Sequence, residues 1–196
     1  MKKSQSIKEN VNFLFEALSL TRLQRTGWQI LGDGKESLAD HTFMVCMISL
    51  VLADKERANR EKVLLLALFH DFSETRIGDV YKLSDLYIHA DSKKALTDAV
   101  GNISFRQTIV TLLKDFEKKG SIESKVVHDA DVLALCLYLK TLVEKGNTHA
   151  KEWLDGNSER LRLASSKKFY RDIMTTSSQD WWKREREKIH RKYKNE

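Results

Sequence analysis

The chain of 196 residues contains no proline and only eight glycines. Proline is the strongest interruption of a helix, and tight turns between strands draw heavily on both residues. A β-sandwich or β-barrel of this length needs many such turns. No run of four or more residues alternates cleanly between apolar and polar, so few or no strands are expected. The composition and pattern therefore predict an all-α fold.

Apolar residues recur at helical spacing in most of the chain. The predicted helices cover residues 6–18, 36–53, 60–72, 103–118, 122–145, 148–154, 158–174 and 178–193. Ser37, Asn59 and Ser121 are expected N-caps, and Asp40 completes a capping box with Ser37. Residues 20–34 hold three glycines and should contain a turn, whereas residues 82–102 show no clear pattern.

The predicted helix at 122–145 is apolar on nearly every side between residues 126 and 143, which is typical of a central, buried helix. No repeat or low-complexity linker divides the chain. We expect a single-domain helical bundle over residues 1–196, with a core at about 8–183 and a basic terminal helix at 178–193.

The chain has 34 lysines and arginines against 28 aspartates and glutamates, a net charge of +6. Acidic residues interleave with the cations of the terminal helix, so a solvated surface helix is expected and nucleic acid is not the expected partner. No run of 18 uncharged apolar residues predicts a membrane span. Cys46 and Cys136 lie in apolar runs and are interpreted as buried thiols of a cytoplasmic protein.

Three positions carry ionisable groups where the helical pattern predicts core. His41 lies between Leu38 and Val45 on the apolar stripe of its helix. His70 and Asp71 continue the inward face of the predicted helix at 60–72. Histidine suits the C-terminal end of a helix dipole, but aspartate does not.

Asp131 is the third position, inside the most apolar helix. Its only basic neighbour at three or four residues' distance is His128. A buried carboxylate without a partner costs several kcal/mol, so it is usually paired or bound to a metal. Taken singly, each of these residues also fits a hydrogen-bonded core position.

Two imidazoles and two carboxylates that meet in one cavity explain all three positions together. His41, His70, Asp71 and Asp131 then form an N2O2 ligand set for one divalent transition metal such as Mn, Fe, Co, Ni or Zn. Water completes the coordination of such a site and leaves a position open for chemistry.

Three further residues are candidates beside this ligand set. Glu74 follows His70 by four residues and faces the same cavity if the helical path continues, or else is a solvated loop carboxylate. Asp79 follows Gly78 and is either a site residue or the start of a turn. Arg25 can hold a phosphate through two parallel hydrogen bonds, or simply lie on the surface.

The order His41, His70-Asp71, Asp131 resembles the HD superfamily of metal-dependent phosphohydrolases. The surrounding residues resemble its motifs: residues 36–41 match E-S-V-A-[ED]-H, residues 70–79 match H-D-x-x-E-x-x-x-G-D, and residues 130–133 match A-D-x-L. Residues 23–28 resemble the L-x-R-T-G-W element of the 5′-deoxynucleotidase branch, and residues 180–182 its C-terminal aromatic pair. The resemblance covers about residues 8–183.

The resemblance implies removal of phosphate from deoxyribonucleoside 5′-monophosphates. It implies metal ligands at His41, His70, Asp71 and Asp131, with room for a second, weaker magnesium ion. It gives Glu74, Asp71 and Asp79 catalytic roles, and it gives Arg25, Asp79 and His41 contacts with the nucleotide substrate. Asp40 should point away from the metal, and a homodimer is expected.

Three other functions fit the same residues. Another HD reaction, such as cyclic-nucleotide phosphodiester or nucleoside triphosphate hydrolysis, is disfavoured because residues 72–130 contain only His89 and His128, whereas two-metal relatives carry extra histidines there. A non-enzymatic helical module could bind nucleic acid or a partner through Trp181, Trp182 and the terminal cations, but leaves Asp131 unexplained. An HD scaffold with an intact metal site could also be regulatory.

Overall fold

The computed structural model describes residues 7–32, 35–118 and 120–194, and within them the chain is helical with a single isolated β-bridge, between Gln24 and Ser37. The all-α prediction is confirmed. The α-helices are α1 (Ile7–Ser19), α2 (Leu38–Glu56), α3 (Arg60–Phe69), α4 (Glu74–Ile77), α5 (Ser92–Ala99), α6 (Arg106–Lys118), α7 (Ile122–Glu144), α8 (His149–Gly156), α9 (Ala164–Thr175) and α10 (Asp180–Lys194). Short 3-10 helices lie at η1 (Thr26–Leu31), η2 (Ser84–Leu86) and η3 (Asn157–Arg160). The predicted helix start at Ser6 and the loop glycine Gly34 lie outside the described residues.

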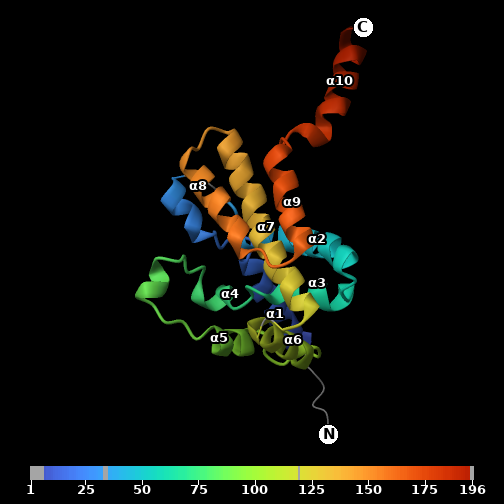
Figure 1. Cartoon of the computed structure of the whole chain (residues 1–196). Helices are drawn as coiled ribbons and strands as arrows, with labels where there is room; N and C mark the ends of the chain where they lie inside the picture. Colours follow the sequence, from blue (N-terminus) through green and yellow to red (C-terminus); the bar gives the residue numbers. More distant parts are fainter. Residues whose placement is uncertain (1–6, 33–34, 119, 195–196) are drawn as a thin grey trace.

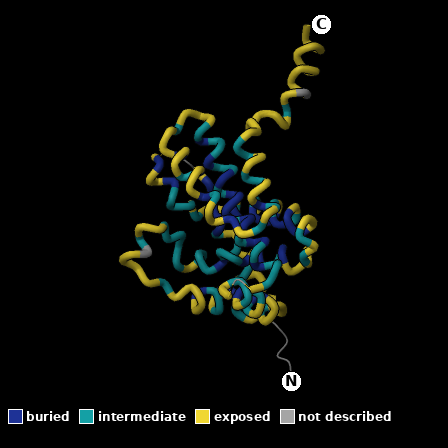
Figure 2. The backbone as a smooth tube through the Cα atoms, in the orientation of Figure 1, coloured by how far each residue is buried: buried dark blue, intermediate teal, exposed yellow. Residues whose placement is uncertain are grey.

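Helix α7 is the centre of the bundle, as its all-round apolar pattern predicts (Figure 1). It packs against α2, α3, α8 and α9. Leu133, Leu139 and Leu142 on α7 are almost completely buried, and each such side chain contributes about 1.5–3 kcal/mol of hydrophobic stabilisation. The buried part of the backbone is concentrated around this helix, while the outer helices are mostly exposed (Figure 2).

The three predicted N-caps are confirmed. The Ser37 hydroxyl accepts the backbone N–H of Asp40, and the Asp40 carboxylate accepts that of Ser37, so the two form a capping box. The side chains of Asn59 and Ser121 cap α3 and α7 by accepting the backbone N–H groups of Lys62 and Ser124, without the reciprocal bond of a capping box. Such a cap contributes typically about 1 kcal/mol. Because Asp40 is exposed and engaged in its cap, it points away from His41, as expected.

The prediction of one continuous helix at 158–174 is wrong. Residues 157–160 form η3, and α9 begins only at Ala164. Leu161 and Leu163 between them are extended, with ψ angles of 132° and 142°. The predicted helix at 60–72 likewise ends early, at Phe69, and the chain turns there before α4.

Asp129 on α7 explains the break before α9. Its carboxylate is fully buried and accepts the backbone N–H groups of Arg162 at 3.0 Å and Leu163 at 2.8 Å. Burial alone would raise the pKa of Asp129, but the hydrogen bonds from His128, Leu163 and Arg162 lower it below its usual value. These bonds hold residues 162–163 away from a helical path and fix where α9 begins.

Helix α10 extends away from the rest of the bundle and is exposed along its length (Figures 1 and 2). Trp181 is 84% exposed, so it does not pack into the body of the chain, and the Arg186 guanidinium lies 5.1 Å from the Trp182 ring. The solvated-helix interpretation therefore holds. Within the described residues, no helix is both long enough and apolar enough to cross a membrane.

We expect Asp129→Asn to lower the free energy of unfolding by about 1–3 kcal/mol, because it weakens buried, charge-assisted hydrogen bonds. Since folding lowers the pKa of Asp129, this stabilisation is complete above the unfolded carboxyl pKa of about 3.9 and is lost as the pH falls through the lower folded pKa. Urea unfolding at pH 7 and pH 3, followed by circular dichroism, measures the difference.

The matched control is Asp172→Asn on the exposed side of α9. Its effect should stay within about 0.5 kcal/mol. An Asp129→Asn variant no less stable than this control would contradict the anchoring role of Asp129.

Candidate functional site

The four predicted metal ligands meet where α2, α3 and α7 come together. His41 lies in the second turn of α2, His70 and Asp71 directly follow α3, and Asp131 projects from α7. His41 Nε2 lies 3.1 Å from Asp131 Oδ1 and 3.9 Å from Asp71 Oδ2. His70 Nε2 lies 3.1 Å from Asp71 Oδ2. Residues up to ninety positions apart in the sequence thus form one compact group.

The two imidazoles present buried nitrogen atoms to this group. His70 Nδ1 lies 2.8 Å from the Ala67 carbonyl, and because a carbonyl oxygen only accepts, Nδ1 carries the proton and Nε2 faces the carboxylates. His70 Nε2 and both ring nitrogens of His41 are buried without a hydrogen-bond partner. Buried polar atoms are rarely left so, and a histidine held by its other nitrogen is the usual arrangement of a metal ligand.

The pKa shifts of His70, Asp71 and Asp131 show that this group favours a positive charge. Burial opposes ionisation of Asp71 and Asp131, but the neighbouring histidines overcome it and lower the pKa of both carboxyls. Burial likewise lowers the pKa of His70, yet Asp71 and Asp131 outweigh it and raise that pKa to about 9. The raised pKa of His70 and the lowered pKa values of Asp71 and Asp131 show that the two carboxylates favour a positive charge beside them.

These donors fit a divalent ion. One ligand atom each from His41, His70 and Asp71 lies within 4.8 Å of the others, close enough to share one ion. Asp131 is not among these three residues, but its Oδ1 atom lies 3.1 Å from His41 Nε2, so a second carboxylate stands beside the group. Two imidazole nitrogens and two carboxylates suit the borderline first-row ions from Mn to Zn.

Glu74 and Asp79 flank the group on the short helix α4 and the residues after it. Burial, followed by the charges of Asp71 and Asp79, raises the pKa of Glu74 to about 9, so this carboxyl is protonated at neutral pH. Gly78 has a φ of +74°, a conformation that glycine adopts without strain, and it ends α4. Asp79 then accepts the backbone N–H of Thr26, which fastens it to the first residue of η1.

Arg25 lies in the site and not on the outer surface. Its Nη1 atom is 3.5 Å from Asp71 Oδ2 and its Nε atom is 3.7 Å from Glu36 Oε2. The loop is held there because Arg25 donates its backbone N–H to the Glu36 carbonyl at 2.9 Å, beside the Gln24–Ser37 bridge.

Glu36 is a site residue to which the sequence interpretation assigns no role. Its side chain is 4% exposed, and it accepts the indole N–H of Trp28 at 3.0 Å while facing Arg25 and His41. The position of Glu36 at the start of the E-S-L-A-D-H motif is the sequence feature that could have identified it as a site residue. A carboxylate buried five residues before a predicted ligand needs a partner, and here the partners are the Trp28 indole and the Arg25 guanidinium.

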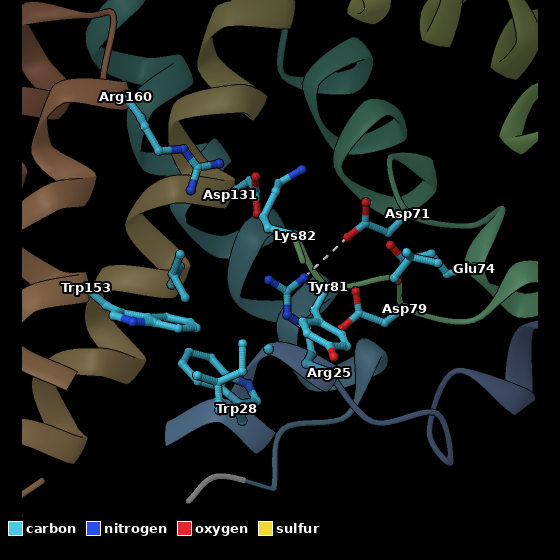
Figure 3. Close-up of a pocket in the computed structure, with 14 residues that line it drawn as sticks. Arg25, Trp28, Asp71, Glu74, Asp79, Tyr81, Lys82, Asp131, Trp153 and Arg160 are labelled. Carbon is cyan, nitrogen blue, oxygen red and sulfur yellow. Dashed lines mark ion pairs between the residues drawn. The ribbon is translucent and has the colours of Figure 1, made fainter. Parts of the chain in front are cut away.

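A pocket of about 330 Å³ opens from this group (Figure 3). Asp71, Glu74, Asp79 and Arg25 lie at one end, and Trp28, Trp153 and Arg160 lie at the other, with Asp131 between them. Tyr81 and Lys82 complete the wall. The sequence interpretation missed Trp153, Arg160, Tyr81 and Lys82, since they stand outside any motif and reach the pocket only through tertiary packing.

The comparison with known families agrees with this geometry. The family model described as HD domain matches residues 18–169. The chain belongs to the HD domain family. The match to this HD domain includes the four proposed ligands, Arg25, Glu74 and Asp79, and it ends before α10.

Individual relatives extend the comparison. The HD domain is similar to 5′-deoxynucleotidase HDDC2 of Danio rerio, with 30% identity over 73% of this chain and 70% of that protein. It is 33% identical to 5′-deoxynucleotidase YGK1 of Saccharomyces cerevisiae, over 63% of this chain and 64% of the yeast protein. Its fold resembles the crystal structure of the PH0347 protein from Pyrococcus horikoshii, with a TM-score of 0.71 and 29% identity over 83% of this chain and 97% of that one.

We expect Co²⁺ at about one hundred times its dissociation constant to raise the free energy of unfolding by about 2.7 kcal/mol, because the ligands are assembled only in the folded state. Asp131→Ala should lose most of this stabilisation. Chemical unfolding with and without Co²⁺, together with elemental analysis of the purified proteins, provides the measurement.

Asp155→Ala, which removes an exposed carboxylate on α8, serves as the control and should keep the wild-type response. If Asp131→Ala binds as much metal as this control, Asp131 is not a ligand.

Proposed function

We propose that this HD domain is a metal-dependent phosphomonoesterase that removes phosphate from deoxyribonucleoside 5′-monophosphates. The observation that carries the proposal is the convergence of His41, His70, Asp71 and Asp131 at a pocket that also holds Arg25. The names of the relatives, which are 5′-deoxynucleotidases, support the substrate class.

His41, His70, Asp71 and Asp131 are the proposed ligands of one divalent transition metal. The N2O2 set is compatible with Mn, Fe, Co, Ni or Zn, and the Asp79 carboxylate is the proposed protein contact of a second, weaker magnesium ion. When bound, a divalent ion supplies Lewis-acid neutralisation of phosphate oxygens and lowers the pKa of water.

Arg25 binds and orients the phosphate in this proposal. Its guanidinium is already turned toward Asp71 at 3.5 Å, and Glu36 holds its Nε side. A guanidinium matches two phosphate oxygens at once, and as the P–O5′ bond breaks it stabilises the charge spread over the phosphoryl oxygens.

Glu74 is the proposed general acid. A carboxyl with a pKa raised to about 9 holds its proton at neutral pH, and its Oε2 atom is buried without a hydrogen-bond partner. As the P–O5′ bond breaks, Glu74 gives this proton to the leaving 5′-oxygen, either directly or through one water. Asp79, held by Thr26, is suited to accept a hydrogen bond from a sugar hydroxyl, and Asp71 to orient the attacking water.

We further propose a homodimer in the cytoplasm, with residues 8–183 as one folding unit. Large apolar side chains exposed on α1 and α2 support the dimer: Val11, Leu14, Phe15, Leu18, Phe43, Met47 and Val51. The unpaired, buried thiols of Cys46 and Cys136 suit a reducing compartment. A monomer mass in sedimentation equilibrium would contradict the dimer.

Phosphate release tests the function. We expect the protein loaded with Mn²⁺ or Co²⁺ to release inorganic phosphate from deoxyribonucleoside 5′-monophosphates, and to lose this activity with a chelator. A panel of deoxyribo- and ribonucleoside monophosphates and deoxyribonucleoside triphosphates compares the reactions. Pyrophosphate or triphosphate released from the triphosphates, with no phosphate from the monophosphates, would contradict the proposal.

Glu74→Gln should lower kcat by about 100- to 10,000-fold while its metal content stays at the wild-type level, because it removes the proton and not a ligand. Glu61→Gln, at an exposed position on α3, is the control and should keep full activity. An unchanged kcat would exclude Glu74 as the acid, and loss of the metal would identify it as a ligand instead.

A further inference from the structure

The two ends of the pocket differ in the chemistry of their side chains. The end with Asp71, Glu74 and Asp79 is acidic, whereas Trp28 and Trp153 lie at the other end (Figure 3). Ile30 and Leu135 add aliphatic surface to the pocket lining. Burying a phosphate against indole and aliphatic side chains is costly, but the flat faces of a nucleobase suit them. A nucleotide whose phosphate lies beside Arg25 therefore directs its base toward the aromatic end.

The two tryptophans at the aromatic end of the pocket are held in place by their neighbours. Trp28 is 2% exposed, its indole N–H is bound to Glu36, and its ring lies 4.5 Å from that of Tyr138. Trp153 is half-buried on α8, and its indole lies beside Gly27, at a distance where a Cβ would make an ordinary van der Waals contact of 3.9 Å. Trp153 thus presents part of its ring to the pocket while the remainder is packed.

Arg160 adds a positioned hydrogen-bond donor to this end. Its Nη1 atom donates to Asn157 Oδ1 at 2.7 Å, and Asn157 Nδ2 in turn donates to the Trp153 carbonyl at 2.7 Å. Within the described residues, the Nε–Nη2 edge of Arg160 has no hydrogen bond and no carboxylate at ion-pair distance. Arg160 therefore lines the pocket with a two-donor edge ready for a ligand.

We propose that Trp153 and Arg160 form a nucleobase subsite, in which the indole stacks on the base and the guanidinium edge donates two hydrogen bonds to it. This assignment rests on the proposed phosphomonoesterase function. A guanidinium has donors only, so it is complementary to a base with two adjacent acceptors. Guanine offers the adjacent acceptors O6 and N7, and cytosine offers O2 and N3. Adenine and thymine have no such pair, because each of their acceptors either stands next to an N–H group or has no second acceptor beside it.

The test compares nucleotides with a phosphomonoester that lacks a base, 2-deoxyribose 5-phosphate. We expect Trp153→Leu to lower kcat/KM about tenfold for all four deoxynucleoside monophosphates and to leave the baseless substrate unchanged. Arg160→Met should lower kcat/KM by about 5- to 20-fold for dGMP and dCMP, with smaller losses for dAMP and dTMP. The controls are Trp181→Leu on exposed α10 and Arg162→Met, two residues beyond Arg160 and also exposed.

Equal losses on the baseless substrate would overturn the assignment, since Arg160 or Trp153 would then serve the phosphate, the sugar or the fold. Unchanged kinetics for all substrates would overturn it as well. If the wild-type protein hydrolyses none of the five phosphates, the proposed function fails, and the subsite is tested alone by calorimetric titration of the Co²⁺-loaded protein. Trp153→Leu must then weaken binding of dGMP and not of 2-deoxyribose 5-phosphate, and any other result rejects the subsite.

Discussion

Two carboxylates are held ionised in the interior of the bundle, and the surrounding architecture is organised to keep them so. Asp71 follows α3 and lies 3.1 Å from the ring of its neighbour His70, and Asp131 projects from α7 to within 3.1 Å of the His41 ring on α2. Their side chains are 24% and 28% exposed, so only part of the cost of removing these charges from water is incurred, but it still has to be offset. The apolar packing of α7 against α2, α3, α8 and α9 offsets that cost. A divalent cation supplies the positive charge that the two carboxylates favour.

The loops around this group are positioned by hydrogen bonds between backbone and carboxylate. The Glu36 carbonyl and side chain hold Arg25, Asp79 is fastened to Thr26, and Asp129 fixes the chain at Arg162 and Leu163. Each of these carboxylates joins segments that are distant in the sequence. The result is a pocket lined by side chains from separate segments of the chain: Asp71, Glu74 and Asp79 at the acidic end, and Trp28 on η1 and Trp153 on α8 at the aromatic end.

The two aspartates of the H-D-A-D-V stretch illustrate how far sequence reasoning reaches. Both lie in the same apolar helix, and the pattern singles out Asp131 as the anomaly. Asp131 does reach the candidate metal group, but its side chain is 28% exposed, whereas that of Asp129 is fully buried. Asp129 binds backbone groups 33 and 34 positions later, and no local pattern shows such partners. For the same reason, the interruption between η3 and α9 is invisible in the helical spacing of residues 158–174.

The sequence by itself determined the helical class, the caps at Ser37, Asn59 and Ser121, and which ionisable residues stand where the helical spacing predicts core, because spacing and capping act within single helices. That His41, His70, Asp71 and Asp131 lie together depends on how α2, α3 and α7 pack. Only the tertiary structure decided which loops close the pocket. Glu36 faces Arg25, and Trp153 and Arg160 face the site from beyond α7, because the packing of segments far apart sets which side chains share a cavity.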